Sequence, residues 1–378
     1  MAGLYIHIPF CRKACHYCNF HFSTTHHQLP AMLAAMEKEL ELQKTYLSGP
    51  LATIYLGGGT PSLIPIPMLE SLFQKIKTAF QIEAGAEITL ETNPDDINPA
   101  ALLAWKAIGI NRLSIGIQSF VDADLQWMNR AHHAQQALDS IRLAKQAGFD
   151  NLTIDLIYGT PTLSDEAWKQ NVDIAIAAGI THLSCYALTV EPKTGLEKMI
   201  EKKQLAAVDP EKQARHFSLL MQWMEDAGFE HYEISNFALP GHRSKHNSSY
   251  WSGKHYLGIG PSAHSFNGQS RQWNIANNSL YIQGLEKNNL LFELETLTQE
   301  QQLNEYIMTS LRTMEGLSLN RVADLWGHDK RDQILFEANK FIARGDAFLE
   351  ADFLILTKSG RLLADGIASD LFFLSNDN

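Results

Sequence analysis

The strongest constraint on the fold is an alternation of strand-like and helix-like segments over the first three hundred residues. Six short apolar runs have strand character, and stretches with helical periodicity separate them. Several of these stretches end in a glycine just before the next strand, as at Gly109, Gly148 and Gly179, which is typical of a helix C-cap. Such repeats predict parallel βα units in a closed barrel, a partial barrel or an open sheet. The strand-like runs are residues 4–8, 53–56, 87–91, 112–118, 151–157 and 182–188.

Polar residues and glycines stand at the carboxyl ends of these strands. Because the carboxyl ends of parallel strands open onto one face, we expect these residues to meet in one pocket. A single carboxylate at such a position could equally cap the next helix, but the whole set is typical of a binding site. The set consists of residues 57–60, Glu91, Asn93, Gln118, Asp155 and Tyr158.

Three of the four cysteines lie within eight residues, directly after the first strand. Cys11, Cys15 and Cys18 have the spacing C-x3-C-x2-C. Three thiolates on one loop can hold a 4Fe–4S cluster and leave one iron without a protein ligand, as a catalytic metal requires. A structural zinc with a nearby histidine as the fourth ligand is the alternative. Cys185, within an apolar strand, is expected to be a small core residue.

Size and charge narrow the classes of function. At 378 residues the chain is longer than the chains that usually fold around a single hydrophobic core, so we expect one large and one small domain. The net charge of -11 argues against a nucleic-acid binder, which needs clustered cations. No apolar run approaches the ~20 residues that span a bilayer, and no signal peptide is evident. Clustered cysteines fit a reducing compartment, so we predict a cytoplasmic protein.

The character of the sequence changes twice after the repeats. Residues 231–295 are rich in glycine and serine, and we expect a loop-rich extension over the barrel mouth. Residues 296–378 show helical stretches and then a short hairpin, which indicates a small helical domain of winged-helix type. Its helices are no more basic than the rest, so we interpret it as a lid or docking module. The predicted domains are therefore residues 1–230, 231–295 and 296–378.

Two motifs resemble a known superfamily. YIHIPFCRKACHYC at 5–18 resembles the opening of the radical S-adenosylmethionine (SAM) enzymes. Together with GGGTPS at 57–62 it is similar to the oxygen-independent coproporphyrinogen III oxidase group, which includes a haem-chaperone (HemW) branch. The resemblance covers nearly the whole chain and implies an α/β fold with a partial (β/α)6 barrel. It also implies a 4Fe–4S cluster on the three cysteines, with SAM bound at the open iron.

The resemblance further implies which residues bind SAM. Three of these residues match positions that contact the amino group of SAM. Two residues beside the cluster loop match further positions that contact SAM. Four residues match positions that bind the ribose, the adenosine and the methionine carboxylate. This agrees with the chemistry, because carboxylates accept hydrogen bonds from ribose hydroxyls and arginine pairs with a carboxylate. In that order they are Gly58, Gly59 and Thr60, then Tyr5 and Tyr17, then Glu91, Gln118, Arg130 and Asp155.

Two features favour the HemW branch over the oxidase. In the oxidase a further cysteine follows the third after one intervening residue, and here Phe20 occupies that position, as it does in the HemW branch. HNSSYW at 246–251 matches the HNxxYW element that is associated with haem binding.

The HNSSYW segment therefore contains the residues that we predict to contact haem. A neutral imidazole is a common haem ligand, and aromatic rings offer flat apolar faces to a porphyrin. The alternative is structural, with His246 as a hydrogen-bonded loop residue and Trp251 as a core anchor. The predicted haem residues are His246, Asn247, Tyr250 and Trp251, with His255 and His264 as weaker candidates.

The resemblance thus predicts a haem chaperone of the HemW type, which binds the cluster, SAM and haem and transfers haem to an acceptor. The implied partners are a haem-accepting protein, such as a respiratory enzyme at the membrane, and an electron donor such as a flavodoxin or ferredoxin. A peripheral position at the membrane would follow. The alternative function is an oxygen-independent coproporphyrinogen III oxidase, which decarboxylates two propionates. The sequence assigns no catalytic residue and leaves open whether SAM is cleaved.

Overall fold

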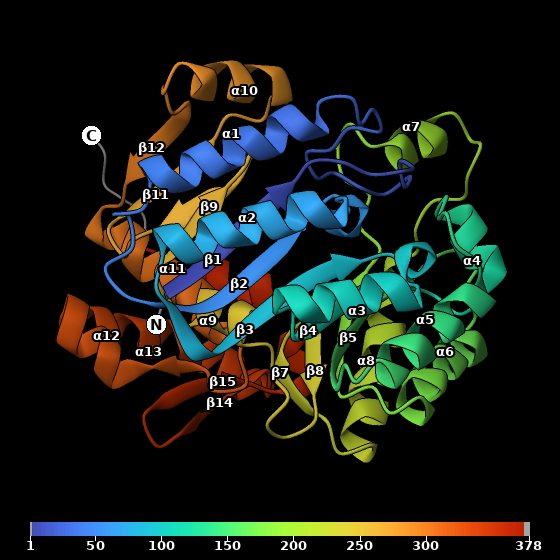
Figure 1. Cartoon of the computed structure of the whole chain (residues 1–378). Coiled ribbons are helices and arrows are strands. Elements are labelled where there is room, and N and C mark those ends of the chain that lie inside the picture. Colours follow the sequence, from blue (N-terminus) through green and yellow to red (C-terminus); the bar gives the residue numbers. More distant parts are fainter. Residues whose placement is uncertain (1, 374–378) are drawn as a thin grey trace.

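The central element of the fold is a run of six parallel strands in the order of the sequence (Figure 1). The computed structural model describes residues 2–373. The strands are hydrogen-bonded to one another as β1-β2-β3-β4-β5-β6, and the sheet continues on both sides without closing on itself. The predicted α/β fold of parallel βα units is confirmed, in the form of a partial barrel. The strands are β1 (Ala2–Ile8), β2 (Leu51–Gly58), β3 (Ile82–Thr92), β4 (Arg112–Gln118), β5 (Asn151–Tyr158) and β6 (His182–Ala187).

Helices cover the convex face of these strands (Figure 1). Side chains alternate between the two faces, so Leu4, Ile6 and Ile8 of β1 enter the core against the helices while their neighbours face the concave side. Gly109, Gly148 and Gly179 all have positive φ after a helix, which confirms the predicted caps. The helices are α1 (Leu29–Leu42), α2 (Ile66–Ala79), α3 (Pro99–Ile108), α4 (Asp122–Trp127), α5 (Ala134–Gln146) and α6 (Asp165–Ala177), with short 3-10 turns at Pro61–Leu63 and Pro94–Asp96.

The segment 231–295 differs from the prediction of a loop-rich extension over the barrel mouth. It extends the sheet at both edges, with β8 antiparallel to β6 and β9 parallel to β1. The edge strands leave backbone N–H and C=O groups unpaired, and these short segments satisfy them although their own periodicity is weak. The added strands are β7 (Glu230–Glu233), β8 (Asn236–Ala238), β9 (Tyr256–Ile259), β10 (His264–Phe266), β11 (Ser270–Asn274) and β12 (Phe292–Thr296). The remaining helices before the C-terminal segment, apart from the helix formed by HNSSYW, are α7 (Gly195–Glu201), α8 (Pro210–Asp226) and α10 (Asn278–Glu286).

The HNSSYW segment forms a short helix, α9 (Lys245–Trp251), on the concave face of the sheet. Buried Glu87 of β3 accepts hydrogen bonds from the backbone N–H groups of Lys245 (3.1 Å) and His246 (3.0 Å). The Arg112 side chain lies 3.9 Å from Glu87, and both are buried. These contacts involve the amino-terminal halves of the strands, so α9 closes that end of the concave face and leaves the carboxyl end open.

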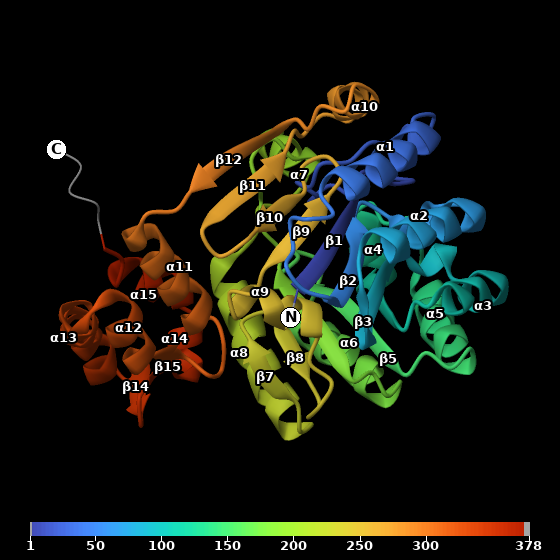
Figure 2. The same ribbon diagram turned by 60° about the vertical axis from the view of Figure 1, so that its left-hand side comes forward.

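The C-terminal segment has a hydrophobic core of its own, which includes Ile307, Val322, Phe341 and Leu354. Figure 2 shows it to one side of the large sheet. It consists of helices and a three-stranded sheet, and the division into three domains stays a prediction. No helix among residues 2–373 is long and apolar enough to cross a membrane. The elements are α11 (Gln299–Leu311), β13 (Leu317–Ser318), α12 (Leu319–Trp326), α13 (His328–Arg344), β14 (Ala347–Glu350), β15 (Phe353–Leu356), α14 (Lys358–Arg361) and α15 (Ala364–Asp370).

Candidate functional site

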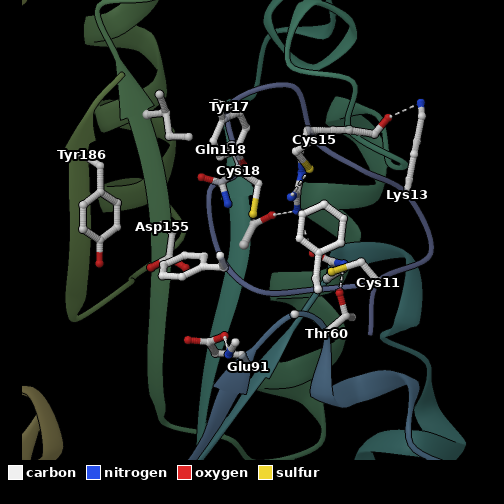
Figure 3. Close-up of a pocket in the computed structure, with 18 of the residues that line it drawn as sticks. Cys11, Lys13, Cys15, Tyr17, Cys18, Thr60, Glu91, Gln118, Asp155 and Tyr186 are labelled. Atoms are coloured by element: carbon white, nitrogen blue, oxygen red, sulfur yellow. Dashed lines mark hydrogen bonds between the residues drawn. The ribbon is translucent and has the colours of Figure 1, made fainter. Parts of the chain in front are cut away.

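A cavity of about 430 Å³ opens at the carboxyl ends of the central strands, and we call it the first cavity. All three cysteines of the predicted cluster loop line it, and Figure 3 shows them around the space that Glu91 and Asp155 also face. The sequence prediction that strand-end residues meet in one pocket agrees with this arrangement. The predicted SAM residues in its lining are Tyr17, Gly58, Gly59, Thr60, Glu91, Gln118, Arg130 and Asp155.

The loop that carries the cysteines is attached on one side to the end of β2. The backbone N–H of Gly59 donates to Ile8 O (2.8 Å), and that of Thr60 donates to Phe10 O (2.7 Å). A Cβ on Gly59 would lie only 2.6 Å from Phe10 O and 2.7 Å from Ile8 O. Only glycine permits this close approach of two backbone segments, which explains the glycine run at the end of this strand.

On its other side the same loop is attached to the turn between α4 and α5. Asn129 Nδ2 donates to Ala14 O (2.7 Å), and Lys13 Nζ donates to Arg130 O (3.2 Å). His16 Nδ1 lies 2.9 Å from Trp127 O. The loop is thereby held just before its first cysteine and again between Cys11 and Cys18, as a rigid metal site requires.

The three thiols on one loop fit an iron–sulfur cubane. Burial raises the pKa of Cys11 to about 11 and also raises the pKa of Cys18. Within residues 2–373, no three His, Cys, Asp or Glu side chains are grouped to hold one metal ion. In a cubane each thiolate binds a different iron, so the sulfurs need not converge on one point.

Two carboxylates face the first cavity, Glu91 from β3 and Asp155 from β5, with β4 between these strands. Glu91 accepts hydrogen bonds from Tyr55 OH (2.7 Å) and from the backbone N–H of Gly58 (3.1 Å). Burial, with a contribution from Asp155, raises the pKa of Glu91 from 4.5 to about 7. Burial likewise raises the pKa of Asp155 from 3.8 to about 6. A cationic ligand with hydroxyl donors, such as SAM, suits this pair.

Arg130 brings a positive charge to the side of the cavity next to the cysteines. Its Nη2 donates to Asn93 Oδ1 (2.7 Å) and Gly116 O (2.6 Å), and its Nη1 lies 3.3 Å from Cys15 Sγ. Gln118, at the end of β4, has φ of 69°, which is uncommon for a residue with a side chain. Such backbone strain is frequent at ligand sites.

The sequence prediction missed several lining residues, and Gly57 and Tyr158 of the predicted strand-end set lie outside the lining. Ser114, Gly116 and Tyr186 also line the first cavity, and the two-residue alternation along β4 would have revealed Ser114 and Gly116. Tyr158 lies outside the lining: it is buried on the opposite face, stacked on Phe217 at 6.1 Å. The same alternation explains this, because Asp155 and Tyr158 are three positions apart on β5.

A second cavity, of about 720 Å³, adjoins the first, and Phe20 lines both. Tyr5 lines the second cavity and is absent from the lining of the first, with its hydroxyl 3.1 Å from His7 Nδ1. The structure therefore does not bring Tyr5 together with the other predicted SAM residues, and its contact with SAM stays a prediction.

The predicted haem residues are divided by the fold. Tyr250 and Trp251 line the second cavity, whereas His246 and Asn247 line neither cavity. His246 is 1% exposed, with its Nδ1 2.8 Å from Thr53 Oγ1 and its Nε2 2.8 Å from Tyr250 OH. Burial and the nearby Arg112 lower the pKa of His246 to about 3, so the ring is neutral, but both of its nitrogens are occupied.

Cys185 stands apart from the site. It is 1% exposed and belongs to the main hydrophobic core, which confirms the expectation of a small core residue.

Comparison with known proteins gives matches over nearly the full length. The profile of the radical SAM superfamily matches residues 5–175. Heme chaperone HemW of Mycobacterium tuberculosis strain H37Rv is 35% identical over 376 residues, which cover 98% of this chain and 94% of that protein. Heme chaperone HemW of Bacillus subtilis strain 168 is 32% identical over 371 residues, 97% of this chain and 98% of that protein.

A solved structure shows the same fold. Coproporphyrinogen III oxidase (HemN) from Escherichia coli, a radical SAM enzyme, superposes with a TM-score of 0.85 at 24% identity. The superposition covers 98% of this chain and 90% of that one. The likeness thus includes the helical C-terminal segment as well as the partial barrel.

Proposed function

Because this chain belongs to the HemW family of the radical SAM superfamily, we propose that it is a haem chaperone that binds a 4Fe–4S cluster, SAM and haem and transfers haem to an acceptor protein. The observation that carries this proposal is the end-to-end match to proteins named heme chaperone HemW. The joint lining of one cavity by the three cysteines and the strand-end residues supports it.

In this proposal the first cavity holds the cluster and SAM. Cys11, Cys15 and Cys18 are the cluster ligands, and when bound the cluster supplies an iron open to SAM and an electron for it. The chain's own residues bind and orient SAM. Glu91 and Asp155 accept hydrogen bonds from hydroxyl donors and offset the sulfonium charge.

The remaining predicted SAM residues act on the methionine and adenosine parts. Arg130 pairs with the methionine carboxylate, and the backbone of Gly58 and Gly59 lets the amino group approach closely beside Thr60. Tyr17 and Gln118 complete the wall of the first cavity around SAM.

A chaperone for haem implies an acceptor that binds haem. As finer proposals, the acceptor is a respiratory enzyme at the membrane and the electron donor is a flavodoxin or ferredoxin. The protein would then act in the cytoplasm, with peripheral contact to the membrane. An oxygen-sensitive cluster needs a reducing compartment, which supports that location.

The test begins with anaerobically reconstituted, reduced protein. We expect a cubane signal in electron paramagnetic resonance that shifts on addition of SAM, because SAM takes the open iron. Cys15→Ser should abolish the signal, whereas Cys185→Ser, a matched change in the core, should retain it. A signal that is indifferent to SAM would contradict the cluster assignment.

Haem transfer is then measured directly. Haem-loaded protein is mixed with a haem-free respiratory acceptor, and the Soret band of the acceptor is followed over time. We expect the transfer rate to rise with acceptor concentration, because a chaperone hands over haem by contact and does not first release it. Sustained anaerobic decarboxylation of coproporphyrinogen III with SAM would instead assign the oxidase function.

A further inference from the structure

The second cavity lies between the edge of the large sheet and the C-terminal helices. Strands β9 to β11 contribute Tyr256, His264, Phe266 and Arg271 to its lining, and the end of α9 contributes Tyr250 and Trp251. Helices α11 and α12 form the facing wall. Its volume of about 720 Å³ is in the range of cofactor sites in proteins. The lining residues from α11 and α12 include Tyr306, Met308, Arg321, Leu325 and Trp326.

The walls of this cavity are rich in aromatic rings from both sides. On the helix side Tyr306 and Trp326 stack at 5.5 Å with 23° between their planes. On the sheet side Tyr250 and Tyr256 meet edge to face at 4.6 Å. Flat apolar surfaces on two walls suit a large planar apolar ligand, such as a porphyrin.

Two arginines line the cavity, and they differ in whether a carboxylate pairs with them. Arg321 lies over the ring of Tyr306 at 4.6 Å, and no carboxylate among residues 2–373 pairs with it. Arg271 Nη2 lies 2.6 Å from Glu305, so its charge is partly neutralised. A cation without a partner at the rim of an apolar cavity suits a carboxylate group on the ligand, such as a haem propionate.

The imidazoles in the lining differ in how far their nitrogens are occupied. His7 has both ring nitrogens hydrogen-bonded, to Tyr5 OH (3.1 Å) and His21 O (2.9 Å), and His21 Nε2 lies 2.7 Å from Asn278 Oδ1. His264 is exposed, and no residue in the described part of the chain forms a hydrogen bond with its ring, which stacks on Trp273 at 6.1 Å. Partial desolvation by its neighbours, and then the charge of Arg271, lower the pKa of His264, so the ring stays neutral and can bind a metal.

We propose that haem binds in the second cavity, with His264 as an axial ligand of its iron and Arg321 beside a propionate. This rests on the proposed function, which supplies haem as the ligand. His246 is then a positioning residue: its Nε2 holds the hydroxyl of Tyr250 (2.8 Å) and thereby fixes one wall. Because Phe20 lines both cavities, haem in the second cavity lies next to the SAM site.

The test is an anaerobic titration of the full-length, cluster-loaded protein with hemin. His264→Ala should lower haem affinity at least about tenfold and remove the spectroscopic signature of an imidazole ligand. Free imidazole should restore that signature in the variant, which a purely structural role would not allow. His27→Ala is the matched control, because His27 is an exposed histidine outside the lining of both cavities. It should bind haem as the wild type does.

A second pair of measurements tests the propionate contact. Arg321→Gln should weaken binding of haem but leave the affinity for haem dimethyl ester unchanged, because the ester carries no carboxylate. Equal losses for both ligands would contradict the assignment of Arg321.

The outcomes separate this proposal from the proposed function. If the wild type binds haem and His264→Ala keeps the same affinity and spectrum, the site is refuted and haem binding stands. If only His246→Ala loses the imidazole signature, with rescue by imidazole, the ligand is His246 and the proposal is again refuted. If the wild type shows no saturable haem binding, the haem-chaperone function itself fails.

Discussion

Glu91 shows how a binding site can reduce the stability of its own protein. Its pKa is raised from 4.5 to about 7, chiefly by burial, so the folded protein holds this proton more tightly than the unfolded chain does. The free energy of unfolding therefore falls as the pH rises from about 4.5 to about 7. Above that range the carboxylate is ionised, and its burial destabilises the folded protein by the full amount. A cationic ligand bound beside Glu91 offsets this destabilisation, so the ionisation of Glu91 is linked to ligand binding.

Replacing this charge should separate stability from binding. We expect Glu91→Gln to raise the free energy of unfolding of the SAM-free protein at pH 8 by about 1–3 kcal/mol, since the amide can still accept from Tyr55 without a buried charge. The same variant should bind SAM more weakly. Chemical denaturation and calorimetric SAM titration measure the two effects. The gain should shrink as the pH is lowered toward 5, and a gain independent of pH would contradict this explanation.

At the scale of elements, the short helix α9 depends on a buried carboxylate from another part of the chain. Glu87 accepts from the backbone of Lys245 and His246 and lies beside Arg112. The first backbone N–H groups of a helix have no partner within the helix, so Glu87 satisfies donors that would otherwise be buried and unpaired. This contact holds the HNSSYW segment against the sheet.

Removal of this carboxylate should be strongly destabilising. Glu87→Ala leaves Arg112 buried without its counter-charge, and we expect a loss of about 3–5 kcal/mol in the free energy of unfolding. Glu83→Ala, at an exposed position on the same strand, is the matched control and should change stability by less than about 0.5 kcal/mol. Denaturant unfolding compares them, and similar losses in the two variants would show that α9 is held by other contacts.

At the scale of the whole molecule, Arg312 joins the C-terminal segment to the large sheet. Its Nη2 lies 3.1 Å from Glu233 of β7, and its Nη1 lies 2.9 Å from Asp365 of α15. The guanidinium also lies over the ring of Trp251 at 5.1 Å. One side chain thus connects β7, α9 and the C-terminal helices, which form part of the wall of the second cavity.

Loss of this connection should affect the two cavities differently. We expect Arg312→Ala to weaken haem binding and to increase hydrogen exchange in α11, because buried Glu233 loses its counter-charge and the helical wall is released. The cluster signal and its response to SAM should persist, since the first cavity is lined by the barrel alone. Arg331→Ala, which removes only an ion pair with the adjacent Asp332, is the control. Equal effects on haem and SAM binding would contradict this division.

Local patterns were sufficient to predict much of the first cavity. Two of the features are short-range: the spacing of Cys11, Cys15 and Cys18, and the polar residues at the ends of consecutive parallel strands. The regular geometry of βα units brings these residues together in one pocket. For the same reason the glycine caps were predictable. Tyr158 lies outside the first cavity because side chains alternate between the two faces of β5. Its position at the end of the strand does not by itself indicate which face it occupies.

The sequence alone determined the parallel βα architecture, the cysteine loop and the residues at the strand ends, because each depends on neighbours along the chain. Only the tertiary structure decided that residues 231–295 extend the sheet, that His246 is buried with both nitrogens occupied, and that a second cavity lies between the sheet and the C-terminal helices. Those features depend on unpaired strand edges and buried charges that are satisfied by segments far away in the sequence, as Glu87 satisfies α9. Such long-range partners have no local signature.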